Sequence, residues 1–203
     1  MKLYPVFLLM AFVTVLIPGP GVVMTLTNSL RYGLRGTFGG ILGIAVGAFV
    51  VAAISSTSVG VILATSTLAF TILKFFGAAY LFYLGVKFWR SPPFRFVETP
   101  THKATFSKRF LEGLSLQLTN PKAVFFFLSV LPQFIDPAQN YVFQFSALVL
   151  TYSALVVLIH TIYALVANRA KYWLASERGG KAIRRVGGAT FLFFGAALAT
   201  AKR

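Results

Sequence analysis

The stretch VTVLIPGPGVVMTL, residues 13–26, places Pro18, Gly19 and Pro20 inside a run of apolar residues. A proline in a helix interior removes a backbone hydrogen bond and clashes with the preceding turn, at a cost of about 3 kcal/mol. A glycine in the same helix costs about 1 kcal/mol more. The stretch therefore predicts a helix that breaks at these residues and starts again after Pro20.

The composition around this stretch is that of a membrane protein. Hydrophobic residues make up 57% of the 203 residues and charged residues only 11%, whereas a soluble domain carries about 25% charge. The net charge is +15, but the basic residues lie between apolar runs and the aromatic residues within them. We therefore expect a lipid bilayer and no nucleic acid as the partner.

The same composition argues against an enzyme or a metal protein. The chain has no cysteine, which excludes disulfides, thiol catalysis and cysteine-bound metal clusters. Its two histidines and four acids form no recognisable nucleophile–base pair or metal cluster. We expect no catalytic residues, no metal and no cofactor.

Six segments are candidates for spanning helices, each of which needs about 20 mainly apolar residues. They are residues 3–29, 37–62, 67–89, 108–134, 141–167 and 184–201. The sequence thus predicts an all-α, polytopic membrane protein with a single transporter domain over 1–203. A cleaved signal peptide is not expected, because Pro18–Gly21 offer no small-residue cleavage site and the apolar run continues to Leu26.

Basic residues gather in alternate loops between these segments. One side would carry Arg31, Arg35, Arg90, Arg95, Lys103, Lys108, Arg109, Arg169, Lys171, Arg178, Lys181, Arg184 and Arg185. The other side would carry Lys2, Lys202 and Arg203. Since basic loops stay in the cytoplasm, six spans would place both termini in the periplasm. A chain with five spans would not keep this pattern.

The second half of the chain resembles the first. ILKFFGAAYLFYLGVKFWR (72–90) aligns without a gap with the last apolar segment, and two pairs of glycines match: Gly77 with Gly187 and Gly85 with Gly195. The first and fourth segments each contain a proline break, which divides the chain into repeat 1 (about 1–90), a basic loop (about 90–109) and repeat 2 (about 110–203). Three spans per repeat would invert the second copy, as in many secondary transporters. Chance similarity between apolar helices is the alternative.

The two breaks are the candidate binding site. Irregular backbone inside a membrane is tolerated only where protein buries it or it lines a wet cavity. After Pro20, and again after Pro121, a half-helix would begin with free N–H groups that suit a carboxylate. Asn120 is a favoured N-cap, Pro121 fits the first helical position, and Lys122 adds a cation. The alternatives are purely structural kinks and a lysine that extends to the membrane interface.

Three segments together resemble the LysE/RhtB superfamily of bacterial amino-acid exporters, and its RhtB branch most closely. They are LIPGPGVVMTLTNSLRYGLRGTFGGILGIAVG, ILKFFGAAYLFYLGVKFWR and LTNPKAVFFFLSVLPQFIDP. The resemblance implies export of small neutral amino acids or derivatives (threonine, homoserine or leucine) across the bacterial inner membrane by proton antiport. It implies site-forming roles for Pro18, Gly19, Pro20, Asn120, Pro121 and Lys122. The next residue, Gly21, stands where the family commonly has a polar residue, so binding there would use the backbone.

Proton coupling requires a titratable group, and the sequence supplies few inside the membrane. Of the four acids, Glu98 and Glu177 lie in basic loops and Glu112 opens the fourth segment. Asp136 lies just past that segment, and His160 lies within the fifth. Asp136 and His160 are the candidates for proton coupling. A turn aspartate and a packing histidine are the simpler interpretations.

Other functions and assemblies remain open at this point. Inorganic-cation efflux occurs among relatives in the same superfamily, but the lack of cysteine and of intramembrane acids disfavours it. A structural scaffold would leave both breaks unexplained. The glycines of residues 39–47 follow G-x-x-x-G spacing, which predicts close helix packing either within the chain or across a homodimer.

Overall fold

The computed structural model describes residues 3–56, 67–90, 105–136, 138–170, 172–173 and 176–200, and the regular elements in these ranges are all helices. The elements are α1 (Tyr4–Leu16), α2 (Pro20–Ser56), α4 (Thr67–Arg90), α5 (Phe106–Leu118), α6 (Pro121–Phe125), a π-helical turn η1 (Phe126–Val130), a 3-10 turn η2 (Leu131–Phe134), α7 (Tyr141–Arg169) and α9 (Glu177–Thr200). These helices fall in all six predicted segments and confirm the all-α class. The end of the second segment (57–62), the loop 91–104, and Lys2, Lys202 and Arg203 lie outside the described residues.

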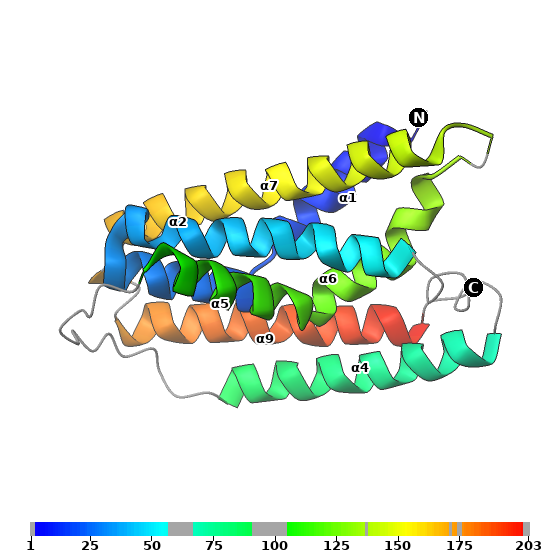
Figure 1. The fold of residues 1–203 in the computed structure, drawn as a ribbon. Coiled ribbons are helices and arrows are strands. Elements are labelled where there is room, and N and C mark those ends of the chain that lie inside the picture. Colours follow the sequence, from blue (N-terminus) through cyan, green and yellow to red (C-terminus); the bar gives the residue numbers. More distant parts are fainter. Residues whose placement is uncertain are drawn as a thin grey trace.

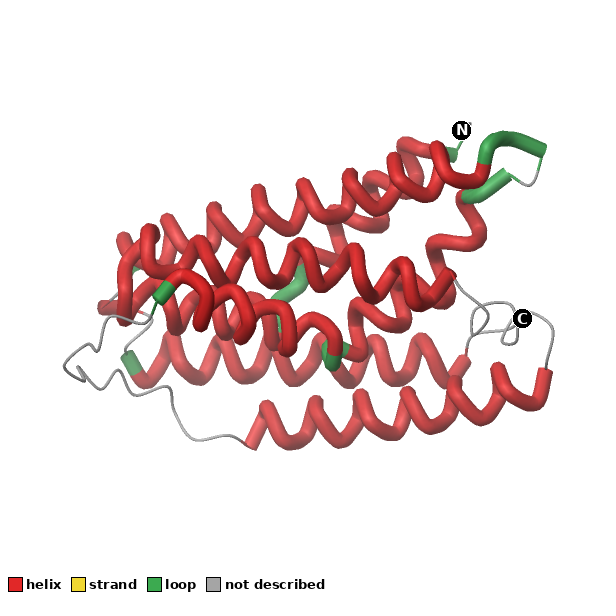
Figure 2. The backbone as a smooth tube through the Cα atoms, in the orientation of Figure 1, coloured by secondary structure: helices red, strands yellow, loops and turns green. Residues whose placement is uncertain are grey.

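Both predicted breaks are present. Helix α1 ends at Leu16, and α2 begins at Pro20. Helix α5 ends at Leu118, α6 begins at Pro121, and the two sides of this second break are bent by 53°. Figure 2 shows both breaks as short loop segments in the middle of the helix bundle. Each break therefore divides a helical segment rather than ending one.

Helix α2 consists of two helical parts joined at Gly33. The backbone of Gly33 has φ 68° and ψ −177°, which is not helical. A positive φ of this size suits glycine because a Cβ atom would crowd the backbone. The chain turns back at this point, so that the part after Gly33 runs in the direction opposite to the first part (Figure 1). This turn is the predicted loop between the first two segments.

The helices pack in two groups. Helix α2 packs along α5 and α7, while α1 packs on α7. Helices α4 and α9 pack on each other, as the lower pair in Figure 1. The main buried cluster joins α1, α2, η1, η2 and α7, and it includes Phe7, Ile44, Phe127, Leu131 and Tyr152. The two breaks lie beside this cluster and not in the α4–α9 pair.

The glycine ladder of α2 packs against α5 of the same chain. A Cβ atom added at Gly43 would clash with the carbonyl oxygen of Phe110, and one at Gly113 would clash with that of Gly40. A Cβ at Gly47 would lie 2.7 Å from Cβ of Gln117. The close approach that the G-x-x-x-G spacing predicted therefore lies within one chain.

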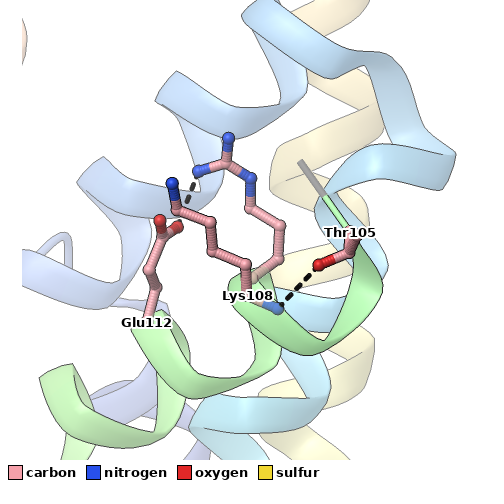
Figure 3. A network of polar contacts seen from close by, with 4 residues as sticks. Thr105, Lys108 and Glu112 are labelled. Atoms are coloured by element: carbon pink, nitrogen blue, oxygen red, sulfur yellow. Dashed lines mark hydrogen bonds and ion pairs between the residues drawn. The ribbon is translucent and has the colours of Figure 1, made fainter. Parts of the chain in front are cut away.

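The first turn of α5 is fixed by polar contacts. Thr105 precedes this helix, and its Oγ1 accepts a hydrogen bond from the backbone N–H of Lys108 at 3.4 Å (Figure 3). One turn on, Glu112 pairs with Arg109 at 2.6 Å. The guanidinium carbon of Arg109 lies 3.9 Å from the ring centre of Tyr32, which ties α5 to the turn of α2.

Within the described part of the chain, two helices are long and apolar enough to cross a membrane. They are Pro20–Ser56 and Tyr141–Ala167, and the bent pair Phe106–Leu118 with Pro121–Phe134 counts as a third if it forms one span. Large apolar side chains such as Leu9, Phe143 and Leu150 are exposed on the outer surface. An outer surface of this kind suits lipid contact, so the chain is a helical membrane protein.

We predict that Gly43→Ala destabilises the protein, because the added methyl group must displace the Phe110 backbone. Overpacking of this kind lowers the free energy of unfolding by about 1–3 kcal/mol. Thermal unfolding of detergent-purified protein measures the effect. Val46→Leu adds one carbon on the exposed face of the same helix and should leave the unfolding temperature unchanged. Equal unfolding temperatures for both variants would contradict the packing of α2 on α5.

Candidate functional site

The first break leaves backbone carbonyls at the end of α1 that side chains from other helices bind. The last carbonyls of a helix have no partner inside it. Nζ of Lys122 donates hydrogen bonds to the carbonyl oxygens of Thr14 and Ile17, each at 2.8 Å. The hydroxyl of Tyr163 donates to the carbonyl oxygen of Leu16 at 2.6 Å. The broken end of α1 is thus capped by α6 and α7.

The second break is what places Lys122 there. Asn120 is the N-cap of α6, and its Oδ1 accepts a hydrogen bond from the backbone N–H of Lys122 at 3.2 Å. Its Nδ2 donates to Oε1 of Gln117 in α5 at 3.0 Å. Pro121 occupies the first helical position, as predicted. The side chain of Lys122 is only 9% exposed, so it is directed into the bundle rather than toward its surface.

On the other side of the first break, α2 begins with N–H groups that no preceding turn can bind. Pro20 has no N–H, and Val23 is the first residue whose N–H reaches back, to the carbonyl of Gly19 at 3.0 Å. A Cβ atom at Gly21 would lie 3.1 Å from Cε1 of His160. The ring of His160 is buried, and its Nδ1 is hydrogen bonded to Oγ1 of Thr25 at 2.7 Å. The imidazole thus packs on the first turn of α2.

The structure brings the two predicted site segments together. A Cβ atom at Gly19 would lie 3.4 Å from Nζ of Lys122, which joins residues 18–21 to residues 120–122. We call this group, with the carbonyls of Thr14 and Ile17 and the ring of His160, the break cluster. It combines the negative end of the α1 dipole, the positive end of the α2 dipole, an ammonium group and an imidazole.

Two side chains of this region were missed in the sequence. Tyr163 and Thr25 give no signal of their own in apolar segments. Tyr163 follows His160 by three residues, and this helical spacing places both on one face of α7. Once His160 is a candidate, that spacing is the signal that could have found Tyr163.

Asp136 lies outside the break cluster. Its two carboxylate oxygens accept hydrogen bonds from the backbone N–H of Ala138 and from Nε2 of Gln139, each at 2.9 Å. The side chain is exposed in the turn between η2 and α7. Among the described acids, Glu112 pairs with Arg109 and Glu177 pairs with Lys181, while Glu98 lies outside the described residues. Of the two proton-coupling candidates, Asp136 and His160, the structure places only His160 beside the breaks.

No metal-binding group is found in the described ranges. No three histidine, cysteine, aspartate or glutamate side chains of these ranges gather so that they could hold a metal ion. The polar groups that the break cluster offers are backbone carbonyls, backbone amides, one amine and one imidazole. They suit hydrogen bonding to a small polar molecule.

Apolar helices broken beside a buried polar cluster are the architecture of a membrane transporter. The family model for the LysE type translocator matches residues 12–202, and the chain belongs to this family. It is 33% identical over 196 residues to a homoserine/homoserine lactone efflux protein of Salmonella typhimurium, covering 97% of this chain and 95% of that protein. An uncharacterized membrane protein of Vibrio cholerae is also 33% identical, over 97% of this chain and 96% of its own. No solved structure matches the chain.

These relatives establish the general class of the protein. The protein is a bacterial membrane protein of a translocator family. This family consists of transport proteins rather than enzymes. The similarity to an efflux protein for homoserine supports export of amino-acid-type molecules. The resemblance inferred from the three sequence segments is confirmed.

We predict that Tyr163→Phe lowers stability, because it leaves the Leu16 carbonyl without its side-chain donor. The loss of one such hydrogen bond costs about 0.5–1.5 kcal/mol. Tyr141→Phe, on the same helix but with an exposed ring stacked on Phe145, is the matched control. Thermal unfolding of both purified variants measures the difference. An unfolding temperature for Tyr163→Phe equal to that of Tyr141→Phe would show that the capping bond contributes nothing.

Proposed function

We propose that the protein is a secondary-active exporter of small neutral amino acids and their derivatives, with homoserine among the substrates, driven by proton antiport. The observation that carries this proposal is the break cluster itself. It presents carbonyls and amides a short distance apart, and a free amino acid has an ammonium and a carboxylate a short distance apart. Substrate would bind at residues 18–21 and 120–122 and at the neighbouring carbonyls of Thr14 and Ile17, mainly through the backbone.

The chemistry of the relatives' named substrates refines this arrangement. Homoserine carries both an ammonium and a carboxylate, whereas its lactone is a cyclic ester without a free carboxylate. The group that the two molecules share is the ammonium. The carbonyls of Thr14 and Ile17 are therefore the anchor of the proposed site. The N–H groups at the start of α2 would bind a carboxylate or a lactone carbonyl oxygen.

The same proposal includes the topology of the chain. Six spans in two inverted repeats, about 1–90 and 110–203, are supported by helices in all six segments and by a break in the first segment of each repeat. The third and sixth segments, α4 and α9, pack on each other, with Gly85 against Gly188. The basic loops would face the cytoplasm and both termini the periplasm of the bacterial inner membrane.

Counterflow in proteoliposomes tests the transport proposal. Vesicles loaded with unlabelled homoserine should accumulate radiolabelled homoserine from outside, and an imposed pH gradient should drive net movement. A panel of leucine, threonine and homoserine lactone would define the substrate range. Failure of the protein to move every member of the panel above the level of empty vesicles would contradict the proposal.

We predict that Asn120→Ala reduces transport about fivefold, because loss of the N-cap costs about 1 kcal/mol and frees the turn that aims Lys122. Asn140→Ala is the matched control. Asn140 caps α7 in the same way, with Oδ1 accepting from the N–H of Phe143 at 2.9 Å. Asn120→Ala should lose more stability, because buried Asn120 also donates to Gln117, so initial rates are compared per folded protein, and only Asn120→Ala should lose rate. Equal losses of rate would show that capping acts only through folding.

A further inference from the structure

Lys122 makes fewer hydrogen bonds than its protonated form has hydrogens to donate. An ammonium has three N–H donors, and the structure uses two of them, for the carbonyl oxygens of Thr14 and Ile17. A neutral amine keeps two N–H donors. Lys122 could therefore lose a proton and still make both bonds. The capping of α1 does not require the charge.

Among the described residues, no carboxylate contacts Lys122. Helix α1 presents backbone carbonyls, and the break before α2 presents the backbone at Gly19. Helix α5 contributes Gln117, whose side chain is hydrogen bonded to Asn120. Helix α7 contributes two titratable groups, His160 and Tyr163, which bond Thr25 and the Leu16 carbonyl. The described acids are bonded elsewhere, as shown above. The charge of Lys122 is thus balanced by the carbonyl dipoles at the end of α1.

Resting on the proposed export function, we propose that Lys122 is the proton-coupling group and that its positive charge excludes the substrate's ammonium from the carbonyls of Thr14 and Ile17. Lys122 donates one hydrogen bond to each of these carbonyls, and a carbonyl oxygen accepts two, so each could also bind an amino-acid ammonium beside a neutral Lys122. Two ammonium groups side by side in a buried site repel strongly, because little solvent separates their charges. Binding of the substrate's ammonium therefore requires Lys122 to become a neutral amine.

An antiporter must bind either the proton or the substrate but not both at once, and this exclusion meets that requirement. When the site is open to the cytoplasm, substrate binds and the Nζ–H bond of Lys122 breaks, leaving its electron pair on nitrogen and passing the proton to cytoplasmic water. When the site is open to the opposite side, substrate leaves and the amine takes a proton from the water there. One proton enters for each substrate molecule exported, and neither an oxidant nor a second reactant is required.

Proton release on binding tests the proposal directly. Homoserine is added to detergent-purified protein in weak buffer, and the pH is followed with an indicator dye. Wild type should release a proton for each substrate bound, and Lys122→Met should release none. His160→Asn keeps a side-chain nitrogen near Thr25 but cannot titrate. Because His160 belongs to the break cluster, this variant can change the affinity for homoserine, but it should still release one proton for each substrate bound. Lys108→Met, at an exposed lysine, should also behave as wild type.

Two results of this experiment would overturn the proposal. The first is proton release that persists in Lys122→Met. The second is a His160→Asn variant that binds homoserine without releasing protons while Lys122 is intact, since His160 would then carry the proton.

A second variant covers the case in which Lys122→Met does not fold. Lys122→Arg keeps the charge and the hydrogen-bond donors, but a guanidinium does not lose its proton in proteins. The arginine should keep its positive charge beside the carbonyls permanently and abolish both substrate binding and export driven by a pH gradient. Export by Lys122→Arg with wild-type proton coupling would contradict the proposal. A wild type that transports nothing in counterflow would instead contradict the export function itself.

Discussion

The structure depends on the hydrogen bonds from Lys122 to the broken end of α1. Backbone groups inside a membrane must be paired, since no water is present to replace a missing partner. A helix that stops at Leu16 leaves carbonyls exposed, and Lys122 binds two of them, at Thr14 and Ile17. Lys122 reaches them because Asn120 starts a new helix at the second break. The two breaks thus depend on each other: one exposes polar backbone, and the other supplies the side chain that binds it.

The packing of α2 on α5 holds this arrangement in register. Glycines at the contact bring the two helices close enough that added Cβ atoms would meet backbone. Because α5 leads directly into the second break, its position along α2 determines where Lys122 lies. The stacking of Arg109 on Tyr32 fixes the far end of the same helix. The break cluster is therefore positioned by rigid helices rather than by long loops, which suits a site that must select a small molecule.

The local features could be predicted from the sequence, and the long-range contacts could not. Proline, glycine and an N-cap asparagine act on the nearest turn of backbone, so the breaks at Pro18–Pro20 and at Asn120 followed from residue type alone. The bonds from Lys122 to α1 join residues more than 100 positions apart, and no local pattern encodes such a pairing. Asp136 shows the converse difficulty: an acid beside an apolar segment has the same local sequence whether it lies in a turn or faces a site. The structure places it in a turn.

The central claim is that substrate binds at the broken end of α1, and substrate protection of a single cysteine tests it most directly. The chain has no cysteine of its own, so Gly19→Cys introduces a unique thiol beside Lys122, and Ser107→Cys introduces one at the exposed start of α5. Homoserine should slow the reaction of a small water-soluble thiol reagent with Gly19→Cys and leave Ser107→Cys unchanged. If saturating homoserine slowed neither variant, or both equally, the substrate would bind elsewhere and the account would be contradicted.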